Sequence, residues 1–133
     1  MIQPKLLSDI NLQGKKILVV EDDFISGQFI KELFDGTHVE IVHVLTASSA
    51  IELLQNNIKF DLVLLDIQLP DMNGLQVAKS IKTKRPNLPI VVQTAYAFDS
   101  YKQRSIEIGC DYFISKPIDI AKLYDIIKKI FKK

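Results

Sequence analysis

Residues 62–74 read LVLLDIQLPDMNG, which is four apolar residues, a single acid at Asp66, and a loop that ends in Asn73 and Gly74. A short, continuous apolar run of this kind is typical of a strand buried on both faces of a sheet. Proline, asparagine and glycine in the residues that follow predict a turn. The stretch therefore predicts a buried strand whose carboxyl end presents Asp66 beside an exposed loop.

Three more short apolar runs, each followed by a polar residue and a turn signal, repeat this pattern along the chain. A fifth candidate, 38–44, differs because its residues alternate, with Val39, Ile41 and His43 on one face, and it is expected at an edge of the sheet. Strands are thus predicted to begin near residues 17, 39, 61, 90 and 112.

Segments with helical spacing follow each predicted strand. In the first, Ile25, Phe29, Ile30 and Leu33 share one stripe, as in a helix that covers a sheet. Regular strand–helix alternation predicts right-handed crossovers and an α/β fold with a doubly wound, five-stranded parallel sheet, (βα)5, with helices on both faces. The predicted helices cover 24–34, 47–55, 74–84, 98–108 and 118–131.

Composition narrows the class of protein. A chain of 133 residues is one domain of ordinary size. With 47% apolar and 25% charged residues it is not typical of a disordered chain, and a net charge of +1 gives no global electrostatic case for nucleic acid. A single cysteine, Cys110, excludes an internal disulfide and a cysteine-based zinc site.

The sequence also gives expectations for location and domain boundaries. No apolar run approaches the roughly 20 residues of a membrane span. The first residues carry no apolar block bounded by a cleavage site, so no signal peptide is predicted and a cytoplasmic location is expected. Residues 1–14 are expected to form an N-terminal arm or linker, and residues 15–133 the folded domain.

Polar residues follow four of the predicted strands, at the edge of the sheet where parallel strands end and where ligands bind in such folds. Carboxylates that crowd within about 6 Å repel one another and resist ionisation, and a bound divalent cation reverses this penalty. Hard oxygen ligands in a compact acidic site suit Mg²⁺. The residues at these four strand ends are, in chain order, Glu21, Asp22 and Asp23, then Asp66, then Gln93, Thr94 and Ala95, and finally Ser115, Lys116 and Pro117.

Asp66 is the strongest candidate nucleophile of this set, because it ends the most apolar strand and precedes an exposed loop. A carboxylate held beside a metal can form an aspartyl-phosphate. Mg²⁺ neutralises phosphoryl oxygens, and the Lys116 ammonium and the Thr94 hydroxyl are placed to supply the remaining contacts to an oxyanion. The residues therefore favour phosphoryl-group chemistry.

The chain resembles the receiver domain of bacterial two-component response regulators. The likeness rests on VVED at 19–22, LDIQLPDMNG at 65–74, TA at 94–95 and SKP at 115–117, in the family's order and spacing. It extends from about Lys15 to Phe131. It implies a flavodoxin-like fold.

The resemblance also implies a role for each matching residue. Asp66 is then the phosphoacceptor, Lys116 binds the phosphoryl group, and the Lys116–Pro117 peptide bond is often cis in the family. For the metal, Asp22 is implied as a direct Mg²⁺ ligand, Glu21 as a ligand through water, and the backbone carbonyl of Gln68 as the last protein ligand. Thr94 is implied as the switch hydroxyl and Phe113 as the switch aromatic, while Gln68 and Tyr96 occupy the positions that tune the phosphoryl lifetime.

By this resemblance the chain is a phosphoprotein switch in two-component or phosphorelay signal transduction, and not an enzyme beyond its own phosphorylation and dephosphorylation. The expected partners are a histidine kinase or phosphotransfer protein, and then a downstream protein target or an attached kinase, with no direct nucleic acid and no membrane span. Two origins stay open: a single-domain response regulator, or the receiver of a hybrid sensor kinase, whose lead-in the residues LQGKK at 12–16 resemble.

Several alternatives remain at this stage. The rival activities are a metal-dependent phosphatase with an aspartyl nucleophile, and a receiver-like module that is not phosphorylated. Phe113 fits a mobile switch ring or a static core ring, and the lysine-rich faces of 74–85 and 116–133 fit a solvated helix surface or a docking surface. Asp23 is predicted to cap the first helix and Asp71 to belong to a turn.

Overall fold

The computed structural model describes residues 6–95 and 99–132 of the 133-residue chain. Strands and helices alternate along it, in the order the sequence predicts. The strands are β1 (Lys16–Val20), β2 (Glu40–Val44), β3 (Leu62–Asp66), β4 (Ile90–Thr94) and β5 (Tyr112–Ser115). The helices are the 3₁₀ turn η1 (Leu6–Asp9), α1 (Phe24–Leu33), α2 (Ala47–Gln55), α3 (Gly74–Lys84), α4 (Asp99–Ile108) and α5 (Ile120–Ile130).

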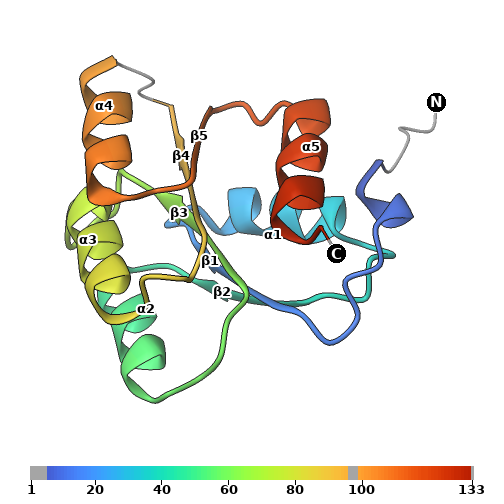
Figure 1. Cartoon of the computed structure of the whole chain (residues 1–133), viewed down its shortest axis with the longest axis horizontal. Helices are drawn as coiled ribbons and strands as arrows, with labels where there is room; N and C mark the ends of the chain where they lie inside the picture. Colours follow the sequence, from blue (N-terminus) through green and yellow to red (C-terminus); the bar gives the residue numbers. More distant parts are fainter. Residues whose placement is uncertain (1–5, 96–98, 133) are drawn as a thin grey trace.

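The five strands form one parallel sheet in the order β2-β1-β3-β4-β5. Helices α1 and α5 cover one face, and α2, α3 and α4 cover the other (Figure 1). The predicted fold class is confirmed, including the position of β2 at an edge. In this order β1 and β3 are parallel neighbours, and the direction in which successive strands are added to the sheet reverses between them. Their carboxyl ends therefore lie side by side at the point where ligands bind in such folds.

Two hydrophobic cores fill the spaces between the sheet and its helices. Alternate strand residues such as Leu18 and Leu65 pack beneath α2 and α3, while Val19 and Leu64 pack beneath α1 and α5. All five residues of β3 are buried, as expected for a central strand with helices on both faces. This burial fixes the position of Asp66, the last residue of β3.

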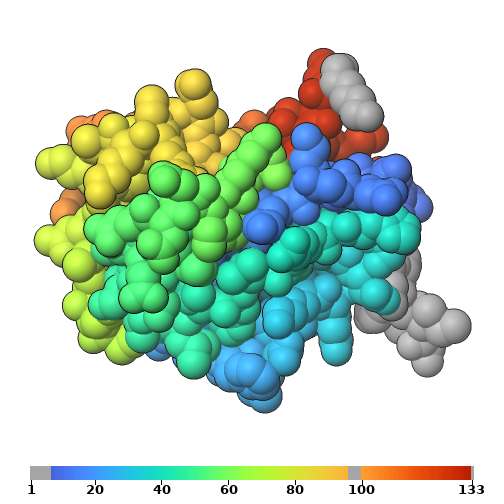
Figure 2. Space-filling model, turned by 90° about the horizontal axis from the view of Figure 1, so that it is seen from below, coloured from blue at the N-terminus to red at the C-terminus, as the bar shows by residue number. Residues whose placement is uncertain are grey.

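The segment before β1 packs onto the domain. Leu7 and Leu12 are both 1% exposed and belong to the core beneath α1 and α5. The Leu12 amide donates to the Thr37 carbonyl at 2.7 Å, which ties the segment to the connection between α1 and β2. Figure 2 shows this blue segment lying along the cyan surface of that connection. The boundary at residue 14 stays a prediction, but part of the expected arm is physically in the core.

The first turn of α1 differs from the predicted stripe. Ile30 is buried, but Ile25 is 74% and Phe29 is 44% exposed, and Phe24 beside them is 57% exposed. The buried face contains Gly27 and Ile30 instead. These exposed apolar side chains lie in the first two turns of α1, shortly after the acids that follow β1.

A search of the described residues for a helix that is long and apolar enough to cross a membrane finds none.

Candidate functional site

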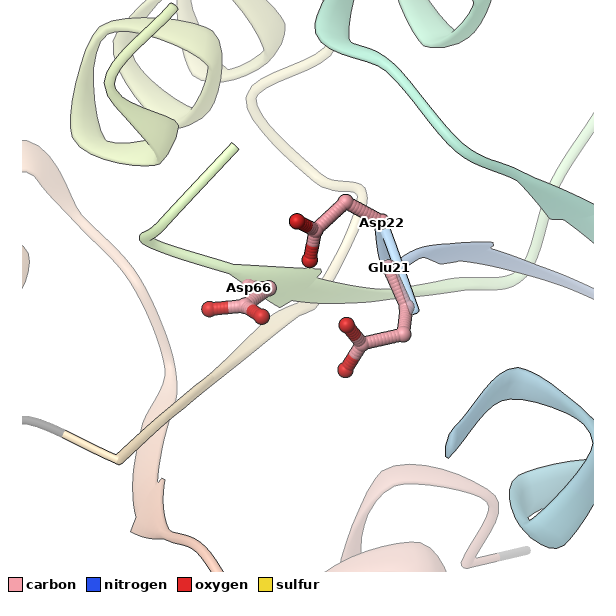
Figure 3. A group of neighbouring side chains, drawn as sticks. All are labelled: Glu21, Asp22 and Asp66. Carbon is pink, nitrogen blue, oxygen red and sulfur yellow. The ribbon is translucent and has the colours of Figure 1, made fainter. Parts of the chain in front are cut away.

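Three carboxylates converge at the carboxyl ends of the two central strands (Figure 3). Glu21 and Asp22 directly follow β1, and Asp66 is the last residue of β3. One carboxylate oxygen from each lies within 4.8 Å of the other two. The structure therefore brings together acids that are far apart in sequence, at the edge where the topology predicts a site.

Asp66 is almost fully buried and each of its carboxylate oxygens has a hydrogen-bond donor. The Gln68 amide donates to Oδ1 at 2.9 Å, and the Lys116 ammonium donates to Oδ2 at 2.8 Å. Gly74, at the start of α3, lies so close that a Cβ there would be 2.3 Å from the Asp66 carbonyl oxygen. Glycine at this position lets the helix begin directly against the strand end, which holds the loop after Asp66 in place.

Glu21 is 1% exposed and is held by contacts to both its backbone and its side chain. Its amide donates to the Val44 carbonyl of β2 at 3.1 Å. Its carboxylate accepts hydrogen bonds from the Asp23 amide and from the Lys116 ammonium. Burial raises the pKa of the Glu21 carboxyl, and its bonds to Lys116 and Asp23 only partly oppose that rise.

Lys116 follows β5 and bridges two acids, since its ammonium contacts both Glu21 and Asp66. The Lys116–Pro117 peptide bond is cis, which agrees with the form often found in the family that the sequence resembles. Burial lowers the pKa of the Lys116 ammonium, but the hydrogen bonds to Asp66 and Glu21 outweigh it, so the net pKa is raised. Lys116 therefore carries a fixed positive charge beside the Asp66 carboxylate.

The donor set of the acidic cluster fits Mg²⁺. Three carboxylates from Glu21, Asp22 and Asp66 offer hard oxygen ligands within one small volume. One lysine balances only part of their charge, so a divalent cation would relieve the remaining repulsion. Asp22 is exposed, and within the described part of the chain its carboxylate has no hydrogen-bond partner, which leaves it available as a ligand.

The other expected site residues lie around this cluster. Thr94 ends β4, is fully buried and pairs in register with Ser115 of β5. Phe113 is half-buried and packs against the core beneath α2 and α3. Gln68 is exposed in the loop after β3. Tyr96 lies outside the described residues.

Asp23 and Asp71 are helix caps and lie outside the acidic cluster. The Asp23 carboxylate accepts from the Ile25 amide and the Ser26 hydroxyl at the start of α1, which confirms the predicted cap. Asp71 accepts from Ser48 and from the Ala47 amide at the start of α2. It thus stabilises a neighbouring helix in addition to its place in the turn after β3.

One contact of the site has no counterpart in the sequence analysis. The His43 imidazole, on edge strand β2, reaches the carbonyl oxygen of Glu21 at 2.8 Å. The only sequence signal for it is the alternation of 38–44, which places His43 on the face of the sheet that α1 covers. That pattern indicates the face of the side chain but not its partner.

Comparison with known proteins agrees with this geometry. The family model of the response regulator receiver domain matches residues 17–128. Hybrid signal transduction histidine kinase L of Dictyostelium discoideum is 34% identical over 124 residues, which are 88% of this chain and 7% of the kinase. The polar-differentiation response regulator DivK of Brucella anthropi is 30% identical over 116 residues, which are 86% of this chain and 94% of DivK.

Solved structures give the same result. A CheY-like response regulator receiver domain protein from Methanospirillum hungatei superimposes with a TM-score of 0.81 at 30% identity, over 86% of this chain and 91% of that one. The non-phosphorylated HemR receiver domain from Leptospira biflexa also gives 0.81, at 34% identity, over 90% of this chain and 95% of that one.

Proposed function

Because the chain belongs to the response regulator receiver domain family, and is a receiver domain of two-component signalling, we propose that Asp66 is its phosphoacceptor. The observation that carries the proposal is the ion pair between Asp66 and Lys116, at 2.8 Å, inside a cluster of three carboxylates. A nucleophilic carboxylate needs a fixed position and a cation to neutralise the incoming oxygens, and this pair supplies both.

The chemistry assigned to the chain's own residues is a single in-line displacement. An oxygen of Asp66 attacks the phosphorus of a phosphohistidine, the new oxygen–phosphorus bond forms, and the phosphorus–nitrogen bond breaks. Lys116, already bonded to Asp66, moves with little rearrangement onto the phosphoryl oxygens. Glu21, Asp22, Asp66 and the Gln68 carbonyl would hold Mg²⁺, which when bound neutralises charge on those oxygens.

The proposed phosphodonor is a histidine kinase or phosphotransfer protein that docks over the first two turns of α1. Phe24, Ile25 and Phe29 are exposed there, directly after the acids of the site. A hollow beside Lys116, lined by Phe29 and Ile118 among others, continues this apolar surface. A partner that covers this surface would bring its histidine to Asp66 and exclude water from the transfer. The exposed apolar surface beside the acids therefore supports a protein as the phosphodonor.

The proposed output is a population shift at the end of the sheet that carries β4 and β5. Thr94 and Phe113 lie on these adjacent strands. A phosphoryl group on Asp66 would draw the Thr94 hydroxyl toward it, and Phe113 would follow as the surface of α4 and β5 changes. The proposed target that reads this surface is a downstream protein or an attached kinase; one of the relatives named above is a hybrid histidine kinase and another is a response regulator.

A comparison of two phosphodonors tests this function against its rivals. With acetyl phosphate and Mg²⁺ the protein should take up one equivalent of phosphoryl group, which it then loses by its own hydrolysis. With p-nitrophenyl phosphate, a substrate suited to phosphatases, it should show no sustained release of nitrophenol. Sustained turnover of the nitrophenyl ester would indicate the aspartyl-nucleophile phosphatase instead, and no uptake from either donor would indicate a receiver-like module that is not phosphorylated.

A further inference from the structure

We propose that His43 is a positioning residue of the acidic site: its imidazole fixes the peptide between Glu21 and Asp22 and so aims both carboxylates at the cation. The inference rests on the proposed function for the identity of the site. His43 lies on the edge strand β2 and contributes no carboxylate to the cluster. In the contacts described, its imidazole touches none of the three carboxylates.

The hydrogen bond itself determines which ring nitrogen carries the proton. His43 Nε2 lies 2.8 Å from the carbonyl oxygen of Glu21. A carbonyl oxygen can only accept, so Nε2 must donate and the imidazole must be protonated there. The Glu21 amide donates to the Val44 carbonyl at 3.1 Å. Both peptide groups of Glu21 are therefore held by two consecutive residues of β2.

Gly27 of α1 gives the imidazole its place. A Cβ at position 27 would lie 1.9 Å from Cε1 and 2.4 Å from Nε2 of His43. The ring thus occupies the space that a side chain on α1 would otherwise fill. The Phe24 ring, also on α1, lies nearby, at 6.4 Å between centroids and 31° between planes. Packed between strand and helix in this way, the imidazole can hold its donor toward Glu21.

The consequence falls mainly on Asp22. The carbonyl of Glu21 and the amide of Asp22 belong to one planar peptide unit, so a bond to that carbonyl fixes the direction in which the Asp22 backbone leaves β1. The Asp22 side chain is exposed, and its carboxylate makes no hydrogen bond to the described residues. The orientation of its peptide is therefore the main restraint on where this ligand points before the cation binds.

Three sets of substitutions separate positioning from packing. His43→Gln keeps an N–H donor at the same number of bonds from the backbone as Nε2. His43→Phe keeps a ring against Gly27 but removes the donor. The double variant Gly27→Ala with His43→Ala places a methyl group in the vacated space from the helix side and also lacks the donor. The full chain is titrated with MgCl₂ by calorimetry, and its unfolding by urea is measured in parallel.

We expect Mg²⁺ affinity to fall about tenfold in His43→Phe and in the double variant, in the range known for residues that orient metal ligands, and to stay near wild type in His43→Gln. The urea midpoint should not follow this order, because His43→Phe keeps a ring in the space and loses affinity all the same, whereas His43→Gln loses the ring and keeps affinity. Should His43→Phe fail to fold, the double variant carries the same comparison with His43→Gln.

Wild-type affinity in both donor-free variants would overturn the inference. So would losses of affinity that simply track the loss of stability across all three sets. Labelling by acetyl phosphate is measured alongside and keeps the two proposals separate. If Asp66 is labelled while the donor-free variants bind Mg²⁺ normally, the positioning role fails and the function stands. If affinity depends on the donor but Asp66 is never labelled, the function fails and the positioning role stands.

Discussion

Lys116 and Asp66 form an ion pair across the carboxyl edge of the sheet, with 2.8 Å between Nζ and Oδ2. Asp66 is the last residue of β3 and Lys116 directly follows β5, and β4 lies between these two strands. The lysine side chain is 23% and the aspartate side chain 5% exposed. Because the same ammonium also contacts Glu21, one cation links the candidate nucleophile to the candidate metal ligands.

Replacing Lys116 should therefore affect phosphorylation more than folding. In Lys116→Ala we expect labelling by acetyl phosphate to slow by about 100-fold, as when one donor to a developing oxyanion is removed. The urea midpoint should change much less. Lys122→Ala, which removes an exposed lysine from α5, is the matched control and should label normally. A large loss of stability with unchanged labelling would instead assign Lys116 a structural role.

Mg²⁺ binding should require Asp22 and depend on pH. Asp22→Ala should weaken binding at least about tenfold, because it removes an ionised oxygen ligand. Lowering the pH should weaken binding in the wild type, since ligands must be deprotonated, and should do so above the usual range of a glutamate because burial raises the pKa of Glu21. Asp23→Asn, an adjacent acid that only caps α1, serves as control in a calorimetric titration. Equal affinities in all three proteins would remove Asp22 from the metal site.

Asp71 should make stability depend on pH in the acid range. Hydrogen bonds from Ser48 and from the Ala47 amide lower the pKa of Asp71 to about 2. A lowered pKa means that the ionised cap stabilises the fold at neutral pH, above the unfolded pKa, and that this contribution is lost as the pH falls toward about 2. Asp71→Asn should be less stable than wild type at neutral pH, and the difference should shrink on acidification.

Urea unfolding of both proteins across that pH range is the measurement. Asp125→Asn, at an exposed position on α5, is the control and should show no such convergence. A difference between Asp71→Asn and wild type that stays constant with pH would mean that the carboxylate charge does not stabilise the start of α2.

Thr94 should couple the site to the surface of α4 and β5. With beryllofluoride on Asp66 as a phosphoryl mimic, we expect amide hydrogen exchange to slow between about residues 96 and 114 and to change little in α1 and α2. Thr94→Ala should still accept a phosphoryl group but lose this protection, because the hydroxyl is needed for the inward movement and not for attack by Asp66. Identical hydrogen exchange in the beryllofluoride adducts of wild type and Thr94→Ala would rule out the Thr94-mediated switch. It would not change the assignment of Asp66 as the phosphorylation site.

The predicted strand ends were sufficient to find most of the candidate site. Short apolar runs have few alternatives to buried strands, and parallel topology forces their carboxyl ends to one edge. Glu21, Asp66 and Lys116 could therefore be grouped from sequence although they lie far apart along the chain, and the structure brings them into contact. The grouping follows from topology and does not depend on side-chain detail.

Other contacts depend on details of packing that periodicity does not carry. Lys82 looks like a solvated lysine on a basic helix face, yet its ammonium binds Asp111 at 3.0 Å and the Leu88 carbonyl at 2.8 Å. Arg85 on the same stretch donates to carbonyls of Leu54 and Ile58, at the end of α2 and in the loop beyond it. Half of the basic residues of 74–85 thus join elements within the domain, which reduces the charge available for a docking surface there.

Leu7 and His43 were missed for a similar reason. Leu7 stands in a short segment, KLLSDINLQ at 5–13, in which polar and apolar residues are mixed and which is too short for its spacing to indicate that Leu7 packs beneath α1 and α5. The contact from His43 to Glu21 needs both the register of an edge strand and a glycine at position 27 of the facing helix. The spacing of residues within the strand or within the helix does not show that these two features meet in space.

Intact-mass measurement after incubation with acetyl phosphate and Mg²⁺, followed by peptide mapping, tests the assignment of Asp66 most directly. Wild type should gain one phosphoryl group, located on the peptide that contains Asp66, and Asp71→Asn should gain it as well. Asp66→Asn should gain none, because the other two carboxylates of the cluster, Glu21 and Asp22, are assigned to the metal and not to attack on phosphorus. A phosphoryl group that persists in Asp66→Asn, or that maps to a different residue in wild type, would contradict the assignment.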